Sequence, residues 1–198
     1  MIVGVTGSFG SGKTTIAKMF EFLGAYVIDV DSVCHSLMEP KRKVYKRIVR
    51  YFGTEILGTD RRIKRSLLAE IVFREKSKLK LLNRLIHPEA IREVNKIIKA
   101  KKKKKIIVVD AALLVETGFY KRMDKLIVVK ANRKKQVERL LRSKGEKRRG
   151  VLQRIGMQAP LKEKLVCADF IIDNSGLRRE TRVRVEKIWQ NLRGDVCQ

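Results

Sequence analysis

Eight residues near the N-terminus constrain the fold of this chain more than any other feature. The segment GSFGSGKT at residues 7–14 matches the pattern G-x-x-x-x-G-K-[ST] without a mismatch. It follows a short β-branched run at residues 2–6 and precedes apolar residues spaced i, i+3, i+4 and i+7 from Ile16. This order predicts a strand, a glycine-rich loop and a helix, which is the context in which the pattern forms a phosphate-binding loop.

The phosphate-binding loop (residues 7–14) predicts a nucleotide ligand. Its glycines let backbone N–H groups converge on phosphate oxygens, and the start of the following helix adds the positive end of its dipole. Lys13 is placed to reach the β and γ phosphates, and the hydroxyl of Thr14 is a ligand for Mg²⁺. ATP and Mg²⁺ are therefore the expected cofactors, although the loop by itself does not name the group that accepts a phosphate.

Further apolar runs predict an α/β fold. Gly24 ends the first helix, and an apolar run at residues 26–30 follows it. Strand, helix and strand in this order form a βαβ unit, which requires a parallel sheet covered by helices on both faces. Buried strands are also predicted at residues 106–110, 126–130 and 170–173. The expected architecture is a parallel sheet flanked by helices.

Residues 32–100 have a different pattern. Their apolar positions repeat with helical period, and no strand pattern interrupts them. His87-Pro88 predicts a helix boundary, because proline suits the first helical position and disfavours the helical conformation of the residue before it. The insertion is longer than a crossover requires. We interpret it as a helical acceptor-binding subdomain, inserted into a nucleotide-binding core of residues 1–31 and 101–198.

The net charge of +26 is the unusual quantity of the composition. The first 40 residues hold two lysines against four acidic residues, so the excess lies in the rest of the chain. Such a surface attracts polyanions or small anionic substrates. A nucleic-acid partner is not expected, because the sequence has neither interleaved RNA-binding aromatics nor zinc-finger spacing. The five-lysine run at residues 101–105 is interpreted as a solvated loop.

Cysteine usage and hydropathy predict a cytoplasmic protein. Cys34, Cys167 and Cys197 include no C-x-x-C pair, which argues against a disulfide framework and against a zinc site. The N-terminus lacks the features of a secretory signal, and no apolar run approaches the roughly 18 residues of a membrane span. We therefore expect no membrane partner, and the oligomeric state is left open.

Two aspartates follow the second predicted strand. Asp29 and Asp31 stand at its carboxyl end, the edge at which open α/β sheets bind ligands. A carboxylate there can take the proton of an acceptor hydroxyl as the γ-phosphoryl group departs. The alternative for Asp31 is that it caps the helix that follows.

Two arginines, Arg139 and Arg142, share one face of a predicted basic helix at residues 133–142. They are placed to clamp a transferring phosphoryl group. The charged residues 144–149, which come directly after this helix, fit a segment that closes over ATP. The alternative is that both arginines belong to a solvated helix face.

The chain resembles the dephospho-coenzyme A kinase family over nearly its whole length. The matching pieces are the phosphate-binding loop, GAYVIDVD at residues 24–31, Arg65 with Leu68 and Val72-Phe73, His87-Pro88, LLVE at residues 113–116, Gln136, Arg139-Leu140 and Arg142, Gln158, Ala168-Asp169 and IDNSG at residues 172–176. Each piece is common by itself. Their order and spacing carry the resemblance.

The resemblance implies a P-loop kinase core, an inserted helical domain for the coenzyme A precursor, and a lid over ATP at about residues 139–158. It implies transfer of the γ-phosphate of ATP to the 3′-hydroxyl of dephospho-CoA, the last step of coenzyme A synthesis. The substrates would be the small molecules ATP and dephospho-CoA. The implied catalytic residues are Asp31 as the base, Lys13 and Arg139.

The resemblance also implies binding residues. For ATP these are Ser8, Phe9, Gly10, Ser11, Gly12, Lys13, Thr14, Thr15, Arg142 and Asn174, with Thr14 also holding the metal. For the acceptor they are Asp29, Arg65, His87 and Leu114. The family motif D-x-P-L-L-x-E has Ala112 in place of its proline, a difference that concerns the local shape of the loop and removes no functional side chain.

Two other functions compete with this interpretation. One is a P-loop kinase for another small acceptor such as a nucleoside monophosphate, from which the helical insertion with Arg65 and His87-Pro88 distinguishes the chain. The other is a nucleic-acid-stimulated P-loop ATPase that uses the basic surface, and it predicts binding that falls steeply with salt. His35 and His87 have no Ser or Cys partner pattern and are interpreted as structural rather than catalytic.

Overall fold

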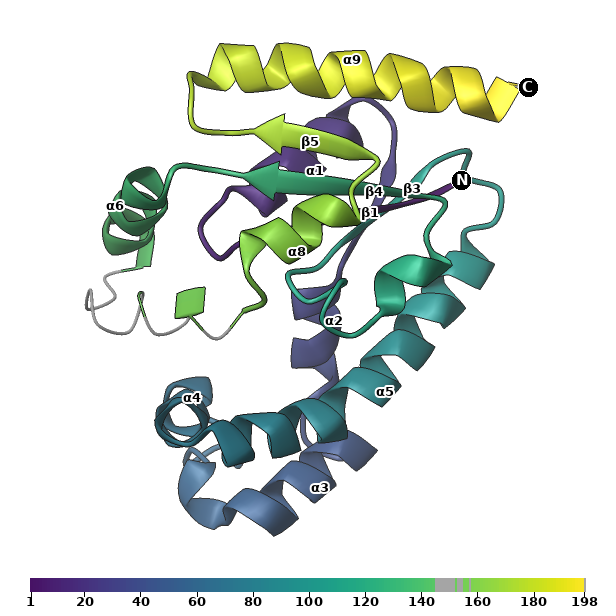
Figure 1. Ribbon diagram of the computed structural model, residues 1–198. Helices are drawn as coiled ribbons and strands as arrows, with labels where there is room; N and C mark the ends of the chain where they lie inside the picture. The colour runs from purple at the N-terminus through teal and green to yellow at the C-terminus, as the bar shows by residue number, and fades with distance from the viewer. Residues whose placement is uncertain (145–151, 153–154, 157, 198) are drawn as a thin grey trace. The chain divides into compact units, whose positions relative to one another are not determined.

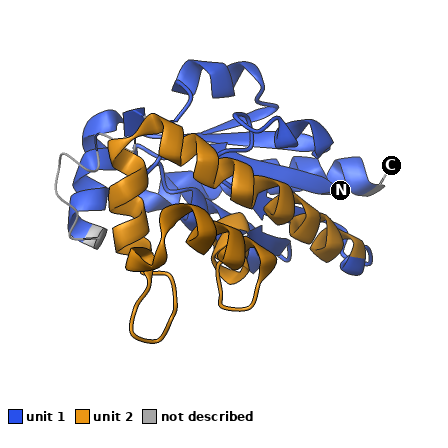
Figure 2. Cartoon of the chain, turned by 90° about the horizontal axis from the view of Figure 1, so that it is seen from below, with its two compact units in different colours: residues 1–29, 100–198 blue, residues 30–99 orange. Residues whose placement is uncertain are grey.

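The computed structural model describes residues 1–144, 152, 155–156 and 158–197, and it divides into two compact units (Figure 2). Unit 1 comprises Met1–Asp29 and Ala100–Gln198, and unit 2 comprises Val30–Lys99. Most of the central part of the expected lid, at about residues 139–158, lies outside the described residues. Each unit has its own apolar core and is described by itself.

Unit 1 is built on a five-stranded parallel sheet with the order β2-β3-β1-β4-β5 (Figure 1). The strands are β1 Ile2–Gly7, β2 Tyr26–Asp29, β3 Ile107–Asp110, β4 Lys125–Lys130 and β5 Phe170–Asp173. The expected α/β class is confirmed, and each strand predicted from an apolar run is present. β1 lies at the centre of the sheet, so the phosphate-binding loop leaves it between the ends of β3 and β4.

In the described part of unit 1 the helices are α1 Lys13–Phe22, α6 Arg133–Lys144, α8 Leu161–Val166 and α9 Arg178–Cys197, with the short η2 Phe119–Arg122. α1 and α9 bury apolar faces in the core of the sheet. Phe20 of α1 and Trp189 of α9 lie with ring centroids 6.3 Å apart in the core that contains Val3 and Val5 of β1. Val196, near the end of α9, also packs against this core.

Unit 2 is helical apart from one isolated antiparallel bridge between Leu57 and Ile63. Its elements are α2 Val30–Leu37, α3 Lys43–Phe52, η1 Thr54–Ile56, α4 Arg65–Arg74 and α5 Lys76–Ala100, whose last residue belongs to unit 1. Its core joins α3, α4 and α5 through Ile48, Leu68 and Ile86, which are at most 7% exposed.

The predicted helix boundary at His87-Pro88 is wrong, because α5 runs through both residues. Pro88 has no N–H for the carbonyl group of Arg84, and a proline inside a helix costs about 3 kcal/mol. The buried residues Ile86, Ala90 and Val94 lie on either side of it at a spacing of four. The burial of these three residues along one face of α5 outweighs the missing hydrogen bond. Tertiary burial of this kind cannot be seen from local helix propensity.

Candidate active site

The phosphate-binding loop has the backbone that its glycines predict. Gly10 and Gly12 have φ values of 78° and 92°, in the left-handed region that favours glycine. A Cβ at Gly12 would also overlap Nδ2 of Asn174. Within the loop, Ser11 N donates a hydrogen bond to the carbonyl oxygen of Ser8 at 3.0 Å. Lys13 is the first residue of α1, so its neighbouring N–H groups form the N-terminus of that helix.

Arg139 of α6 lies beside this loop. Its Nη2 donates to the carbonyl oxygen of Asn174 at 2.9 Å, and its Nη1 lies 3.7 Å from the position that a Cβ at Gly12 would take. Among the described residues, the buried side-chain polar atoms without a hydrogen-bond partner are Nη1 of Arg139 and Oγ of Ser11. A buried guanidinium N–H without a partner is costly. Ser11 belongs to the phosphate-binding loop, and Nη1 of Arg139 lies beside Gly12 of the same loop.

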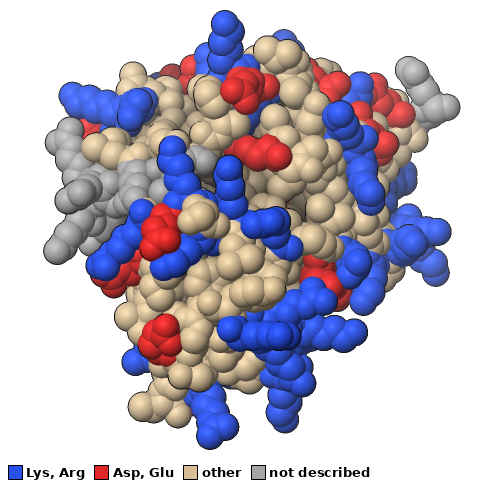
Figure 3. Space-filling model, turned by 60° about the horizontal axis from the view of Figure 1, so that its bottom comes forward, with Lys and Arg blue, Asp and Glu red and all other residues tan. Residues whose placement is uncertain are grey.

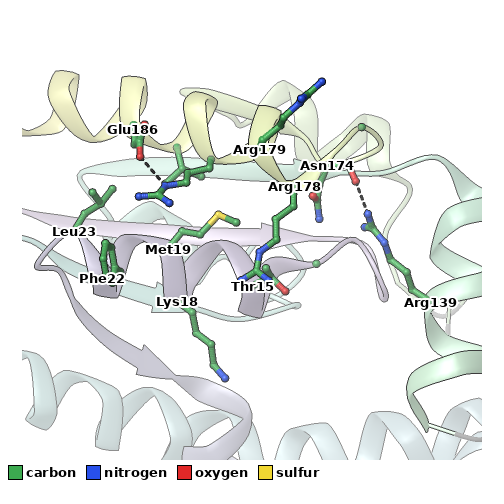
Figure 4. A pocket seen from close by; sticks show the side chains of 14 residues that line it. Thr15, Lys18, Met19, Phe22, Leu23, Arg139, Asn174, Arg178, Arg179 and Glu186 are labelled. Carbon is green, nitrogen blue, oxygen red and sulfur yellow. Dashed lines mark hydrogen bonds and ion pairs between the residues drawn. The ribbon is translucent and has the colours of Figure 1, made fainter.

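A cavity of about 980 Å³ extends from the phosphate-binding loop between α1 and α9 (Figure 4). Thr15 and Lys18 of α1, Arg139 and Asn174 line it. Three arginines of α9 add positive charge to its lining, namely Arg178, Arg179 and Arg182. Glu186 of the same helix is an acidic residue of the lining. Its volume lies at the upper end of the range for small-molecule sites, and its lining favours an anion. Arg142, expected to bind ATP, does not line this cavity.

Asn174 connects three parts of unit 1. Its Nδ2 donates to the carbonyl oxygen of Ser11 at 2.8 Å, and its Oδ1 accepts a hydrogen bond from the hydroxyl of Thr181 at 3.0 Å. Its own carbonyl oxygen accepts from Arg139. The side chain is 163 residues away from Ser11 in sequence and is buried. It therefore holds the phosphate-binding loop and Arg139 in place, in addition to lining the cavity.

The carboxyl edge of the sheet holds a carboxylate that the sequence analysis did not single out. Asp110 ends β3, is 5% exposed, and is in register with Val5 of β1 and Asp29 of β2. Its signal was the apolar run of residues 106–109 directly before it, which is the pattern of a Walker B strand. Asp29 is the last residue of β2 and lies at the carboxyl end of this strand, the position expected for it.

Asp31 belongs to unit 2 and lies in the first turn of α2, because β2 ends at Asp29 and the helix begins at Val30. The strand pattern predicted for residue 30 is thus wrong by one residue. A carboxylate in a first helical turn is favoured by the helix dipole. The capping alternative therefore stands beside the catalytic one for this residue.

The other expected acceptor residues occupy different environments. In unit 2, Nη1 of Arg65 lies 3.0 Å from the ring nitrogens of His35. Burial lowers the pKa of His87 below its usual 6.5. Leu114 of unit 1 is 1% exposed and packs near Gly4 of β1. This side chain is part of the core, and its expected contact with the acceptor stays a prediction.

The positive charge of the chain is spread rather than gathered in one stripe on the face that Figure 3 shows. Lysine and arginine side chains project from many positions there, with acidic side chains between them. The five lysines at residues 101–105 are exposed, and Nζ of Lys101 lies 5.1 Å from the ring centroid of Tyr26. No helix within the described part of the chain is long and apolar enough to span a membrane.

Comparisons with known proteins agree on one family. The family described as Dephospho-CoA kinase matches residues 1–180. The chain belongs to this family. A dephospho-CoA kinase of Aquifex aeolicus is 40% identical over 193 residues, which cover 98% of each chain. One of Syntrophus aciditrophicus is 36% identical, covering 96% of this chain and 82% of the relative.

Solved structures with a similar fold include one dephospho-CoA kinase. The crystal structure of a Thermus thermophilus protein has a TM-score of 0.83 and 29% identity, with 96% of each chain covered. A dephospho-CoA kinase of Campylobacter jejuni has a TM-score of 0.72 and 26% identity, with 98% of each covered. A shikimate kinase of Bacteroides thetaiotaomicron, at 16% identity and a TM-score of 0.57, shares the fold.

Family membership decides among the three candidate functions in favour of the first. The chain is an ATP-dependent phosphotransferase, a dephospho-CoA kinase, which catalyses the final step of coenzyme A biosynthesis. The resemblance found in the sequence motifs is confirmed. Family membership alone does not assign a role to each residue of this chain.

Proposed function

We propose that the phosphate-binding loop, Lys13 and Arg139 hold the phosphates of ATP while the 3′-hydroxyl of dephospho-CoA attacks the γ-phosphorus. The observation that carries this assignment is the buried Nη1 of Arg139, which has no hydrogen-bond partner among the described residues and lies beside Gly12. Phosphoryl transfer needs positioning and charge stabilisation more than covalent chemistry. A guanidinium fixed by Asn174 provides both without moving.

We further propose that Thr14 and Asp110 hold Mg²⁺. A hydroxyl and a carboxylate suit this cation, and Mg²⁺ is usually bound by one or two protein oxygens together with substrate phosphates. When bound, the ion would neutralise charge on the phosphate oxygens. Asp110 contributes by its fixed place at the end of β3, beside the strand that leads into the loop.

Unit 2 is proposed to bind dephospho-CoA through Arg65 and His87. Arg65 supplies a guanidinium group for the phosphates of this substrate, and His35 orients that guanidinium group. His87, with its lowered pKa, is neutral at physiological pH and offers a hydrogen bond rather than a charge. Asp31 is proposed as the base that takes the 3′-hydroxyl proton. A cytoplasmic location is proposed from the cysteine usage and from the cellular supply of ATP.

The direct test is an acceptor panel. Purified protein is incubated with ATP, Mg²⁺ and one acceptor at a time, and products are identified by mass spectrometry. We expect a single phosphate on dephospho-CoA, and none on nucleoside monophosphates or on a dephospho-CoA analogue that lacks the 3′-hydroxyl. Phosphate on a nucleoside monophosphate in place of dephospho-CoA would contradict the proposed acceptor.

Arg139→Ala is expected to lower kcat by roughly 10² or more, since it removes a fixed cation from the transferring group. Steady-state kinetics with both substrates check this, and thermal unfolding checks that the fold remains. Arg133→Ala, at an exposed position of the same helix, is the matched control with an unchanged kcat. A change confined to the KM for dephospho-CoA would instead assign Arg139 to acceptor binding.

A further inference from the structure

A fully buried lysine lies outside the cavity described above. Lys164 of α8 has no exposed surface, and its Nζ lies 2.7 Å from Oε1 of Glu116. The same Nζ donates a hydrogen bond to the carbonyl oxygen of Ala112 at 2.7 Å. A buried ion pair adds little to stability compared with apolar residues of the same volume. The role of the Glu116–Lys164 pair is therefore better sought in the chain segments that it holds together than in stability.

The carbonyl group of Ala112 joins this pair to β1. It also accepts a hydrogen bond from Oγ1 of Thr6 at 3.2 Å, and Thr6 directly precedes the phosphate-binding loop. Lys164 thus fixes the segment after β3 against the strand that leads into the loop. Because the contact uses a backbone carbonyl, alanine serves at position 112 as well as the proline of the family motif.

Glu116 extends the connection to the loop itself. Its Oε1 accepts a second hydrogen bond, from the backbone N–H of Ala159 at 3.1 Å. The preceding residue, Gln158, accepts with its Oε1 a hydrogen bond from the backbone N–H of Phe9 at 2.7 Å. Phe9 belongs to the phosphate-binding loop. The ion pair therefore fixes the backbone from which Gln158 reaches this loop.

The hydrogen bond to Gln158 sets the orientation of the peptide group between Ser8 and Phe9. The N–H of this peptide is bound by Gln158. Its carbonyl oxygen accepts hydrogen bonds from Ser11 N at 3.0 Å and from Nζ of Lys13 at 3.4 Å. A peptide is planar with its N–H and C=O in opposite directions. Holding the N–H on Gln158 therefore keeps the carbonyl directed at Lys13.

We propose that Gln158 is a positioning residue for the phosphates of ATP, and that the Glu116–Lys164 ion pair holds it in place. With the Ser8–Phe9 peptide fixed, Lys13 and the N–H groups of the loop are arranged before ATP binds. A preformed site loses less free energy to ordering when its ligand arrives. The proposal rests on the use of ATP by this family and concerns ATP alone, so the affinity for the acceptor is independent of it.

Gln158→Leu tests the first part, because it removes the acceptor oxygen at similar volume. We expect the Kd of a non-hydrolysable ATP analogue, measured by calorimetry, to rise about fivefold to tenfold, as for the loss of one ordinary hydrogen bond. The KM for ATP rises with it, and the KM for dephospho-CoA is unchanged. Gln190→Leu, an exposed position of α9, is the matched control without effect. An unchanged Kd, or an equal rise in both KM values, overturns the proposal.

The second part is tested by replacing both members of the ion pair, Glu116→Leu with Lys164→Met, because a single change strands a buried charge. We expect a folded protein with the same rise in Kd as Gln158→Leu, and no further rise when the three changes are combined. If the rises in Kd of the two variants multiply in the combined variant, the ion pair does not act through Gln158. Loss of folding in the paired variant would also overturn this part, since the pair would then serve the fold itself. The binding measurement needs no acceptor, so it is separate from any failure of the acceptor panel.

Discussion

Lys13→Ala is expected to reduce turnover by at least roughly 10³, the range that one charge-stabilising cation contributes to phosphoryl transfer. Lys13 opens α1, and its ammonium group lies 3.4 Å from the carbonyl oxygen of Ser8, inside the phosphate-binding loop. In the proposed mechanism it contacts the β and γ phosphate oxygens, on which negative charge develops as the bond to the leaving group breaks. Single-turnover kinetics at saturating ATP measure the loss of the phosphoryl-transfer rate separately from any change in ATP affinity.

The control for this variant is Lys187→Ala. Lys187 is an exposed residue of α9, and its replacement removes the same charge from the surface. It is expected to turn over at the wild-type rate. Thermal unfolding of Lys13→Ala checks that the variant remains folded. A Lys13→Ala variant with wild-type turnover would rule out the assignment of residues 7–14 as the phosphate-binding loop of the active site.

Asp31→Asn is expected to lower kcat by roughly 10² to 10⁴, the usual contribution of general acid–base catalysis. Asparagine keeps the shape of the side chain and much of its hydrogen bonding but loses the basic carboxylate. The affinity for ATP is expected to survive, since Asp31 lies on α2 of unit 2 and not in the phosphate-binding loop. A smaller loss, still above tenfold, would indicate that Asp31 orients the hydroxyl, because the loose transition state needs little early deprotonation.

Asp29→Asn is the matched control for Asp31→Asn. Asp29 ends β2 and is in register with Asp110, whereas Asp31 follows in the first turn of α2. If Asp29→Asn is the more damaging change, the roles of the two carboxylates are reversed. If neither change lowers the rate tenfold while both variants remain folded, Asp31 is a helix-terminal acid and neither residue is the base.

The elements of the sheet were predictable because strands and glycine loops leave short-range patterns. The β-branched run of residues 2–6 followed by glycines predicts β1 and the loop, and the apolar run ending at Asp110 predicts β3. The same reasoning failed at Pro88, because burial of Ile86 and Ala90 in the core of unit 2 outweighs a local helix-breaking signal. Leu114 was assigned from a motif to the acceptor, and its burial against β1 was invisible to that motif.

The sequence by itself determined the class of fold, the phosphate-binding loop and the family, since each depends on the order and spacing of neighbouring residues. Only the tertiary structure decided which side chains support that loop. Asn174 reaches Ser11 across 163 positions, and Gln158 reaches Phe9 across 149. Lys164 meets Ala112 across 52. Such contacts follow from the strand order β2-β3-β1-β4-β5, which brings segments far apart in sequence to the same edge of the sheet. No local pattern carries that order, because it is set by which apolar faces pack together.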